Sequence, residues 1–180
     1  MVAILLGTGF EEVEAIAPCD LLRRAGIETC FVGLEEKTVT GGHGIAVEAD
    51  CVLNELDSSK IEMLVLPGGL GGVNSILGSS AAMELIEKTY HEGKYIAAIC
   101  AAPTILAKLG ITDGKQATCY PGMEDQMGTA KMVPGAAVRD GKILTGKAAG
   151  TAMDFALCLI ETLLDADKAE QVKQSVFYCA

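Results

Sequence analysis

The hydrophobic residues of this chain form short continuous runs, separated by segments in which apolar positions recur at helical spacing. Continuous apolar runs are typical of strands buried on both faces of a sheet. Such runs occupy residues 2–6, 28–34, 61–66 and 95–99. The helical spacing predicts helices over residues 10–25 and 80–92 between them. Strands that alternate with helices indicate an α/β fold, with a mainly parallel sheet between helical layers.

The remaining segments predict two hairpins, a loop, a short strand and two terminal helices. The hairpins are expected to turn at Gly41-Gly-His-Gly44 and at Asp140-Gly141. A glycine-rich loop is expected over residues 67–72, at the end of a buried strand. The short strand and the two helices are predicted at 116–120, 151–164 and 166–175.

Length, charge and cysteine content narrow the class of protein. At 180 residues the chain is predicted to be a single domain, 1–180, with a full core. No apolar run approaches the ~20 residues of a membrane helix, and the first residues read as a buried strand and not as a signal peptide. The net charge of -10 argues against nucleic acid or an anionic membrane as a partner. Seven scattered cysteines without a Cys-x-x-Cys pair favour reduced thiols in the cytoplasm.

The clearest candidate for chemistry is Cys100. A buried strand ends at Ile99, Cys100 stands at the corner, and a helical pattern follows from Pro103. This is the layout of a nucleophile elbow, in which the side chain lies at the carboxyl end of a sheet beside a helix N-terminus. Nearby helix amides are expected to lower the pKa of the thiol. Three other cysteines lie inside apolar segments and are expected to be small buried hydrophobes: Cys30, Cys119 and Cys158.

Glu14 is the candidate partner of this thiol. Helical spacing places it on the apolar face of its helix with Ala17, Pro18 and Leu21. A carboxyl group that points inward must be paired or protonated, whereas a lone glutamate near a helix start is more often solvated. Its place beside the predicted elbow favours the inward interpretation, with a raised pKa and a hydrogen bond to the cysteine.

Histidine is a weaker candidate for that partner. The chain has two histidines, and His91 precedes the strand whose far end carries Cys100, up to roughly 30 Å away. His43 lies in a glycine-flanked turn, where we expect a solvated hairpin tip; the alternative is that the turn reaches the crevice. A Cys-His dyad is therefore not the favoured interpretation.

Two glycine motifs follow buried strands. Gly7-Thr-Gly9 suits a dinucleotide loop, but Glu12 stands in place of the third glycine, and the acidic residues there would repel a pyrophosphate. Pro67-Gly68-Gly69 permits an ordinary tight turn. It equally permits backbone N–H groups to point at an oxyanion beside Cys100.

These segments together resemble the ThiJ/PfpI superfamily, and within it the subfamily of Parkinson disease protein 7 and its YajL-like relatives. The resemblance covers nearly the whole chain and implies a flavodoxin-like (class I glutamine amidotransferase-like) three-layer sandwich and a homodimer. By analogy, part of the dimer interface is expected on the apolar face around residues 15–22. The motifs that carry it are Glu11-Glu-Val-Glu14, Leu64-Val-Leu-Pro-Gly-Gly69, Ala97-Ala-Ile-Cys-Ala-Ala-Pro-Thr104 and Gly150-Thr151.

The resemblance also implies roles for individual residues. Cys100 matches the nucleophilic, easily oxidised cysteine, and Glu14 matches the carboxylic acid that hydrogen-bonds it. Gly69 and Ala101, with Gly68 beside them, match the backbone groups around the anion site. The family is associated with glyoxalase and deglycase activity on methylglyoxal-type adducts, oxidative-stress sensing and chaperone behaviour. No cofactor and no metal are implied.

Two residues depart from the family pattern and a third adjoins such a departure; all three are candidate pocket residues. Tyr120 stands where glyoxalase-type relatives often have a histidine, and a hydroxyl of pKa near 10 is a poor proton shuttle at neutral pH. Thr151 closes an Ala148-Ala-Gly-Thr151 segment that is Gly-Pro-Gly-Thr in many relatives, which alters the pocket wall. His43 takes about the place of a common arginine.

Two hypotheses from different classes follow. The first is a cofactor-free, cysteine-dependent enzyme that acts on small α-oxoaldehydes such as methylglyoxal, or on glycated adducts. The second is an oxidative-stress sensor or redox chaperone that acts through oxidation of Cys100 without turnover. A protease or amidase is a weaker third interpretation, because no histidine adjoins the elbow in sequence.

Overall fold

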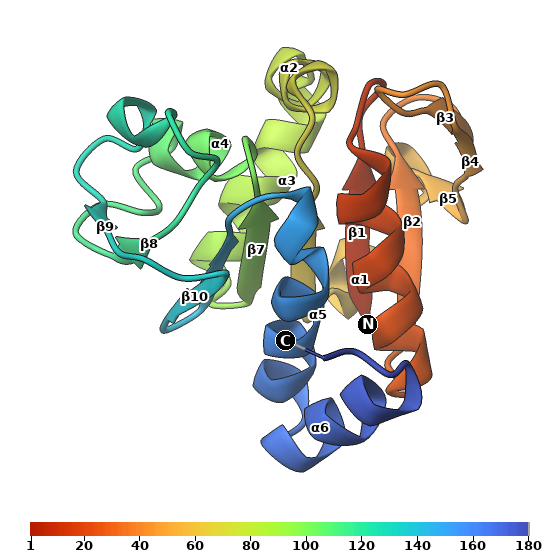
Figure 1. The fold of residues 1–180 in the computed structure, drawn as a ribbon. Coiled ribbons are helices and arrows are strands. Elements are labelled where there is room, and N and C mark those ends of the chain that lie inside the picture. Colours follow the sequence, from red (N-terminus) through yellow and green to blue (C-terminus); the bar gives the residue numbers. More distant parts are fainter. Residues whose placement is uncertain (180) are drawn as a thin grey trace.

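Seven strands form the central sheet of the computed structural model, which describes residues 1–179 (Figure 1). Their order is β10-β11-β7-β6-β1-β2-β5. The β10–β11 pair is antiparallel and every other neighbouring pair is parallel. The strands are β1 (Val2–Leu6), β2 (Thr29–Gly33), β5 (Cys51–Val52), β6 (Met63–Leu66), β7 (Tyr95–Ile99), β10 (Ala137–Asp140) and β11 (Ile143–Gly146).

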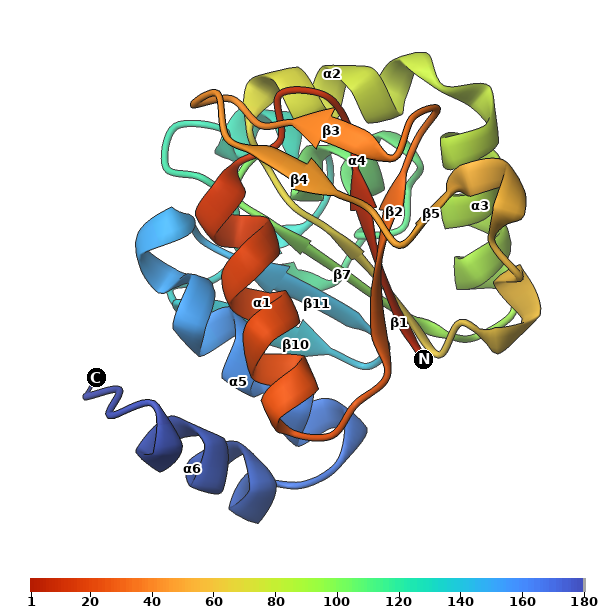
Figure 2. The same cartoon turned by 90° about the vertical axis from the view of Figure 1, so that its right-hand side faces the viewer.

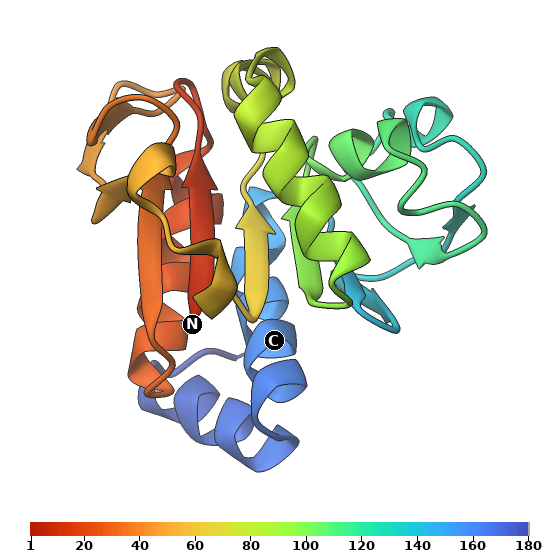
Figure 3. The ribbon, with the colours of Figure 1, turned by 180° about the vertical axis from the view of Figure 1, so that it is seen from behind.

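Helices cover both faces of this sheet. α1 and α5 pack on the face towards the viewer in Figure 1, with α6 against α5. α2, α3 and α4 pack on the face seen from behind in Figure 3. The α-helices are α1 (Glu12–Arg24), α2 (Leu70–Gly78), α3 (Ser80–His91), α4 (Pro103–Lys108), α5 (Ala152–Leu163) and α6 (Ala166–Ser175). Short 3-10 helices are η1 (Leu53–Glu55), η2 (Ser58–Lys60), η3 (Glu124–Gln126) and η4 (Ala149–Thr151).

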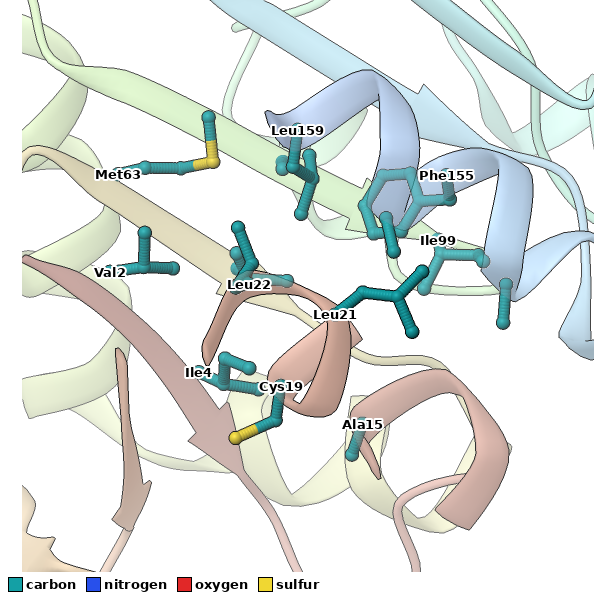
Figure 4. Close-up of a cluster of buried hydrophobic side chains, with 14 of the residues drawn as sticks. Val2, Ile4, Ala15, Cys19, Leu21, Leu22, Met63, Ile99, Phe155 and Leu159 are labelled. Atoms are coloured by element: carbon teal, nitrogen blue, oxygen red, sulfur yellow. The ribbon is translucent and has the colours of Figure 1, made fainter. Parts of the chain in front are cut away.

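The core has two halves because successive side chains of a strand point to opposite faces. In β1, Val2 and Ile4 join the cluster under α1 and α5, whereas Ala3 and Leu5 join the cluster under α2, α3 and α4. Figure 4 shows the first cluster, where Leu21 of α1 and Phe155 of α5 meet over Ile99 at the end of β7. The end of β7 is thereby held by two helices of the same layer.

Two small sheets lie outside the main sheet. β3 (Thr38–Thr40) and β4 (Ala46–Glu48) form an antiparallel hairpin beside the start of α1 (Figure 2). β8 (Gln116–Ala117) and β9 (Lys131–Met132) form a parallel pair in the lobe at the left of Figure 1. This lobe has its own small cluster of buried side chains, formed by Ala117, Cys119 and Met127.

The predicted fold class is confirmed, with two local corrections. The segment expected as a loop over 67–72 instead enters helix α2 at Leu70. Its glycines allow a close approach to the chain after β1, because a Cβ at Gly72 would lie 2.7 Å from the Cα of Phe10. The strand expected over 116–120 has only two residues and pairs with β9, which was not predicted.

The cysteines expected to be buried differ among themselves. Cys119 is buried, as expected, but Cys30 and Cys158 are half-buried.

Among the helices of residues 1–179, none combines the length and apolar character needed to cross a bilayer.

Candidate active site

Cys100 occupies a strained corner between β7 and α4. Its φ of 66° lies in the left-handed region, which costs a residue with a Cβ of order 1–3 kcal/mol. The surrounding backbone holds it there, because the Cys100 N–H donates to Gly146 O at 3.0 Å and the Tyr120 N–H donates to Cys100 O at 2.8 Å. The sharp strand-to-helix corner expected at Cys100 from the sequence is therefore present.

Glu14 lies under this corner with a fully buried side chain. Its Oε2 accepts a hydrogen bond from the Gly68 N–H at 2.9 Å. Burial raises the pKa of Glu14 to about 7, the side-chain contact with Cys100 limits this rise, and the charge of Glu11 adds to it. Oε1 finds no partner of ordinary hydrogen-bond geometry within the described chain, so the contact with the Cys100 sulfur is looser than the Gly68 bond. The inward, partly protonated carboxyl group expected from helix phase is confirmed.

The thiol itself behaves differently from the sequence-based expectation. The pKa of Cys100 is raised to about 12, first by burial and then by the charge and hydrogen bonding of Glu14. Backbone N–H groups of Ala101 and Gly69 oppose this rise, as expected for the end of a strand beside a helix, but burial and Glu14 outweigh them. The prediction of a lowered thiol pKa is wrong, because it neglected the burial of the sulfur and the negative charge placed beside it.

Glycines bring these groups together. A Cβ at Gly68 would lie 2.5 Å from Glu14 Oε2 and 2.8 Å from the Cβ of Cys100, so only glycine fits between the two side chains. Gly69 has φ 82° and precedes α2, and its N–H points towards the Cys100 sulfur along with that of Ala101. The four backbone and side-chain groups predicted around Cys100 therefore converge on one point.

The three candidate pocket residues differ in exposure and in the groups that they contact. The Tyr120 side chain is about half exposed, and its backbone is fastened to Cys100. The Thr151 hydroxyl is used in local hydrogen bonds: its Oγ1 lies 2.9 Å from Ala148 O and accepts from the Ala148 N–H at 3.2 Å. His43 is exposed at the hairpin tip, as expected, and contacts Glu12 instead of the thiol, with 2.8 Å between Nδ1 and Oε2.

The same hairpin supplies a small group of potential metal ligands. Donor atoms of Glu11, Glu12 and His43 lie within 4.8 Å of one another. Glu12 is already engaged, because its Oε1 accepts from the His43 N–H at 2.7 Å and its Oε2 contacts the imidazole. The contacts of Glu12 are those of a carboxylate that fastens the β3–β4 hairpin to α1.

Sequence reasoning missed two contributors to the site. Glu11 caps α1 by accepting from the Glu14 N–H at 2.8 Å, and its charge acts on the Glu14 carboxyl group. Ala149, at the turn before α5, supplies a backbone N–H that lowers the pKa of Glu14. The cap was missed because the helix was predicted to begin at residue 10, whereas α1 begins at Glu12. No local pattern identifies a backbone amide contributed from a distant turn.

Comparison with known proteins places this constellation in a family. The profile of the DJ-1/PfpI family matches residues 1–162. The chain belongs to the DJ-1/PfpI family. Its similarity to protein dj-1beta of Drosophila melanogaster is 38% identity over 176 residues, covering 96% of this chain and 94% of that protein. It is also 36% identical over 126 residues to a deglycase of Pyrococcus horikoshii, covering 70% of this chain and 75% of that protein.

Solved structures of this DJ-1/PfpI family show the same fold. The crystal structure of Drosophila melanogaster DJ-1beta matches with a TM-score of 0.94 at 37% identity, covering 99% of this chain and 98% of that one. The structure of oxidized Toxoplasma gondii DJ-1 matches with a TM-score of 0.95 at 30% identity, with the same coverage of both chains. The flavodoxin-like arrangement expected from the sequence is therefore confirmed along almost the entire chain.

Proposed function

We propose that this DJ-1/PfpI member is a cofactor-free, cysteine-dependent enzyme of the glyoxalase or deglycase type. Its substrates would be α-oxoaldehydes such as methylglyoxal, or their adducts with amines and thiols. The observation that carries the proposal is the contact between the half-buried Cys100 and the buried Glu14, whose carboxyl group has a pKa of about 7. A general base is most effective when its pKa lies near the working pH.

The first step joins the sulfur to the aldehyde carbon. At neutral pH the thiol is protonated and about half of the Glu14 carboxyl groups are ionised, as follows from their pKa values of about 12 and about 7. Glu14 therefore takes the thiol proton as the carbon–sulfur bond forms, so no free thiolate has to accumulate. Glu14 then gives this proton to the former aldehyde oxygen, which completes the hemithioacetal and leaves Glu14 ionised for the next step.

The second step moves a proton between neighbouring carbons. Glu14 removes the proton from the former aldehyde carbon and returns one to the former ketone carbon, giving a thioester of lactate. Water then cleaves the thioester to lactate and the free thiol, so that methylglyoxal and water balance lactate. The N–H groups of Gly69 and Ala101 would stabilise the negative oxygen that develops in these steps.

The test is lactate production from methylglyoxal. We expect turnover by the wild-type protein and its loss in Cys100→Ser and in Glu14→Gln. Lys108→Gln, an exposed change at the far end of α4, is the matched control and should keep full activity. Equal lactate from Cys100→Ser and wild type would contradict the proposal.

One observation favours the sensor as a second candidate function. The Cys100 side chain is partly exposed and adjoins a carboxyl group that is protonated below a pKa of about 7. A protonated Glu14 would donate a hydrogen bond to a sulfinic acid formed on Cys100 by peroxide. Intact-mass analysis after mild peroxide distinguishes the functions, because a sensor should gain two oxygens at Cys100 selectively. Oxidation of several cysteines together would count against it.

We also propose a homodimer, with an interface on the exposed part of the expected face and on the hairpin beside it. The face around residues 15–22 is mostly buried within the protomer, because Ala15 and Leu22 pack into the core under α5. The apolar surface that remains exposed comprises Val13, Ile16 and Ile45, around a shallow hollow of about 470 Å³. Ile16→Glu should convert a dimer to a monomer in light-scattering measurements, whereas the control Glu87→Gln, at an exposed position of α3, should not.

Localisation and domain organisation complete the proposal. All seven cysteines are free in the structure, which fits a reducing compartment, and we place the protein in the cytoplasm. Residues 1–180 would act as one catalytic domain on a small aldehyde or glycated substrate. No membrane and no specific nucleic acid are proposed as partners.

A further inference from the structure

Two cysteines distant from the Cys100 site lie close together at the edge of the sheet. Cys30 belongs to β2, and Cys51 begins the edge strand β5. The parallel pairing of these strands places Cys51 beside Val32. Cys30 is two residues before Val32, so it points to the same face of the sheet. Both thiols contact the buried cluster under α3, and both are half-buried.

The strand geometry sets the distance between the two residues. Neighbouring strands lie ~4.8 Å apart and two residues of a strand span ~6.6 Å, so the diagonal separation of the two Cα atoms is about 8 Å. A disulfide requires Cα atoms closer than about 7 Å. A direct S–S bond between Cys30 and Cys51 would therefore require movement of β5.

A bridging metal ion suits this separation better. Metal–thiolate bonds of ~2.3 Å place two sulfurs up to ~4.6 Å apart, compared with ~2.05 Å in a disulfide. The additional distance of about 2.5 Å is enough to cover the diagonal without moving the strands. The two thiols also interact electrostatically. The pKa of Cys30 is raised to about 11, first by burial and then by the charge of Cys51.

We propose that Cys30 and Cys51 form a two-thiolate site for a soft, thiophilic metal ion of the Cu(I) type. Soft thiolate ligands select Cu(I), which is satisfied by two sulfurs, whereas structural zinc requires four ligands. Across residues 1–179, no third histidine, cysteine or acidic donor converges on this pair. On binding, each thiol releases its proton to solvent and forms one sulfur–metal bond, and the metal keeps its oxidation state.

The acid–base properties of the pair give the site a measurable signature. Burial raises the pKa of both thiols, so both are protonated at neutral pH. Metal binding must then displace two protons, and the apparent affinity should increase about 100-fold for each pH unit. A single thiol such as Cys100 would release one proton and give about 10-fold per unit.

The experiment uses full-length protein carrying Cys100→Ser, so that the active-site thiol does not compete. Anaerobic titration with Cu(I) against a chromophoric Cu(I) chelator measures stoichiometry and affinity between pH 6 and pH 8. We expect one Cu(I) per chain and the two-proton pH dependence. Further substitution by Cys30→Ser or Cys51→Ser should each lower the affinity by at least about 100-fold, and Cys119→Ser should leave it unchanged.

Several results would overturn the proposal. Unchanged affinity in either single variant would do so, and so would an affinity that rises only about 10-fold per pH unit. A second measurement is independent of the variants' folding. A bifunctional thiol reagent that fluoresces only after joining two sulfurs should link Cys30 to Cys51 in the folded Cys100→Ser protein. Failure to recover that cross-linked peptide pair would show that the sulfurs do not approach each other.

Discussion

Replacing Glu14 by glutamine is expected to stabilise the protein at neutral and alkaline pH. Glutamine keeps an oxygen that can accept the Gly68 N–H, now 2.9 Å from Oε2, but it cannot ionise. In the wild-type protein burial raises the pKa of Glu14 from 4.5 to about 7. Because one pKa unit corresponds to 1.36 kcal/mol, ionising this carboxyl group in the folded state costs about 3 kcal/mol.

The sign of the pH dependence follows from the direction of this shift. A carboxyl group with a raised folded-state pKa stabilises the fold in its protonated form. That stabilisation is fully present below pH 4.5 and is lost as the pH rises to about 7. Wild type and Glu14→Gln should therefore be similar in stability near pH 4.5 and differ by about 3 kcal/mol at pH 8.

Urea unfolding of both proteins at pH 5, 6, 7 and 8 measures this difference, with the dependence on urea concentration expected to be the same. The difference between variant and wild type cancels the titration of all other groups. Glu87→Gln, at an exposed position of α3, serves as the control and should show no trend with pH. A Glu14→Gln effect that is constant from pH 5 to pH 8 would refute the assignment of a buried, ionisable Glu14.

Three further predictions concern the elbow. After burial, the charge of Glu14 is the next largest cause of the raised pKa of Cys100, and Glu14→Gln removes it. Iodoacetamide should therefore alkylate the Cys100 thiol of the variant at least about tenfold faster than that of wild type at pH 8. A slower reaction would contradict this electrostatic reasoning. Since Cys100 has φ 66°, Cys100→Gly should be more stable than Cys100→Ala by about 1 kcal/mol in thermal or urea unfolding, and the reverse order would argue against backbone strain. Gly68→Ala should abolish lactate formation because its Cβ would lie 2.5 Å from Glu14 Oε2, whereas Gly78→Ala, with open space around it, should retain activity.

The elements with strong local signals were predictable from the sequence. The strand Tyr95–Ile99 and the helix Ala166–Ser175 match their expected bounds. The helix begins cleanly because the Asp165 side chain accepts from the Lys168 N–H at 2.7 Å, which is an ordinary N-cap. In both cases the residues that define the boundary are adjacent in the chain.

Helix α2 was missed because tertiary contacts override local propensity there. Gly71 and Gly72 favour a loop in isolation, since glycine weakens a helix. In the folded protein their missing side chains admit Gly9 and Phe10, and any Cβ would come within 3 Å of that backbone. A glycine selected for close packing cannot be distinguished from a loop glycine by local sequence alone.

The candidate site shows the same division. The helix phase of Glu14 and the strand end at Cys100 were sufficient to pair the two residues, and the buried Glu14 side chain contacts Cys100 in the structure. The sign of the thiol pKa was not predictable in this way. It depends on how burial and one negative charge compare with two backbone amides, and that balance exists only in the folded protein.

The backbone bonds of the elbow have a consequence for how the β8–β9 lobe opens. The Tyr120 N–H donates to Cys100 O, and the Thr118 N–H donates to Thr145 Oγ1 at 2.9 Å. These two bonds join the lobe to the ends of β7 and β11. Any fluctuation that swings the lobe outward must expose the carbonyl of Cys100. Amide hydrogen exchange at Tyr120 and Thr118 would therefore report the integrity of the elbow without any label on the sulfur.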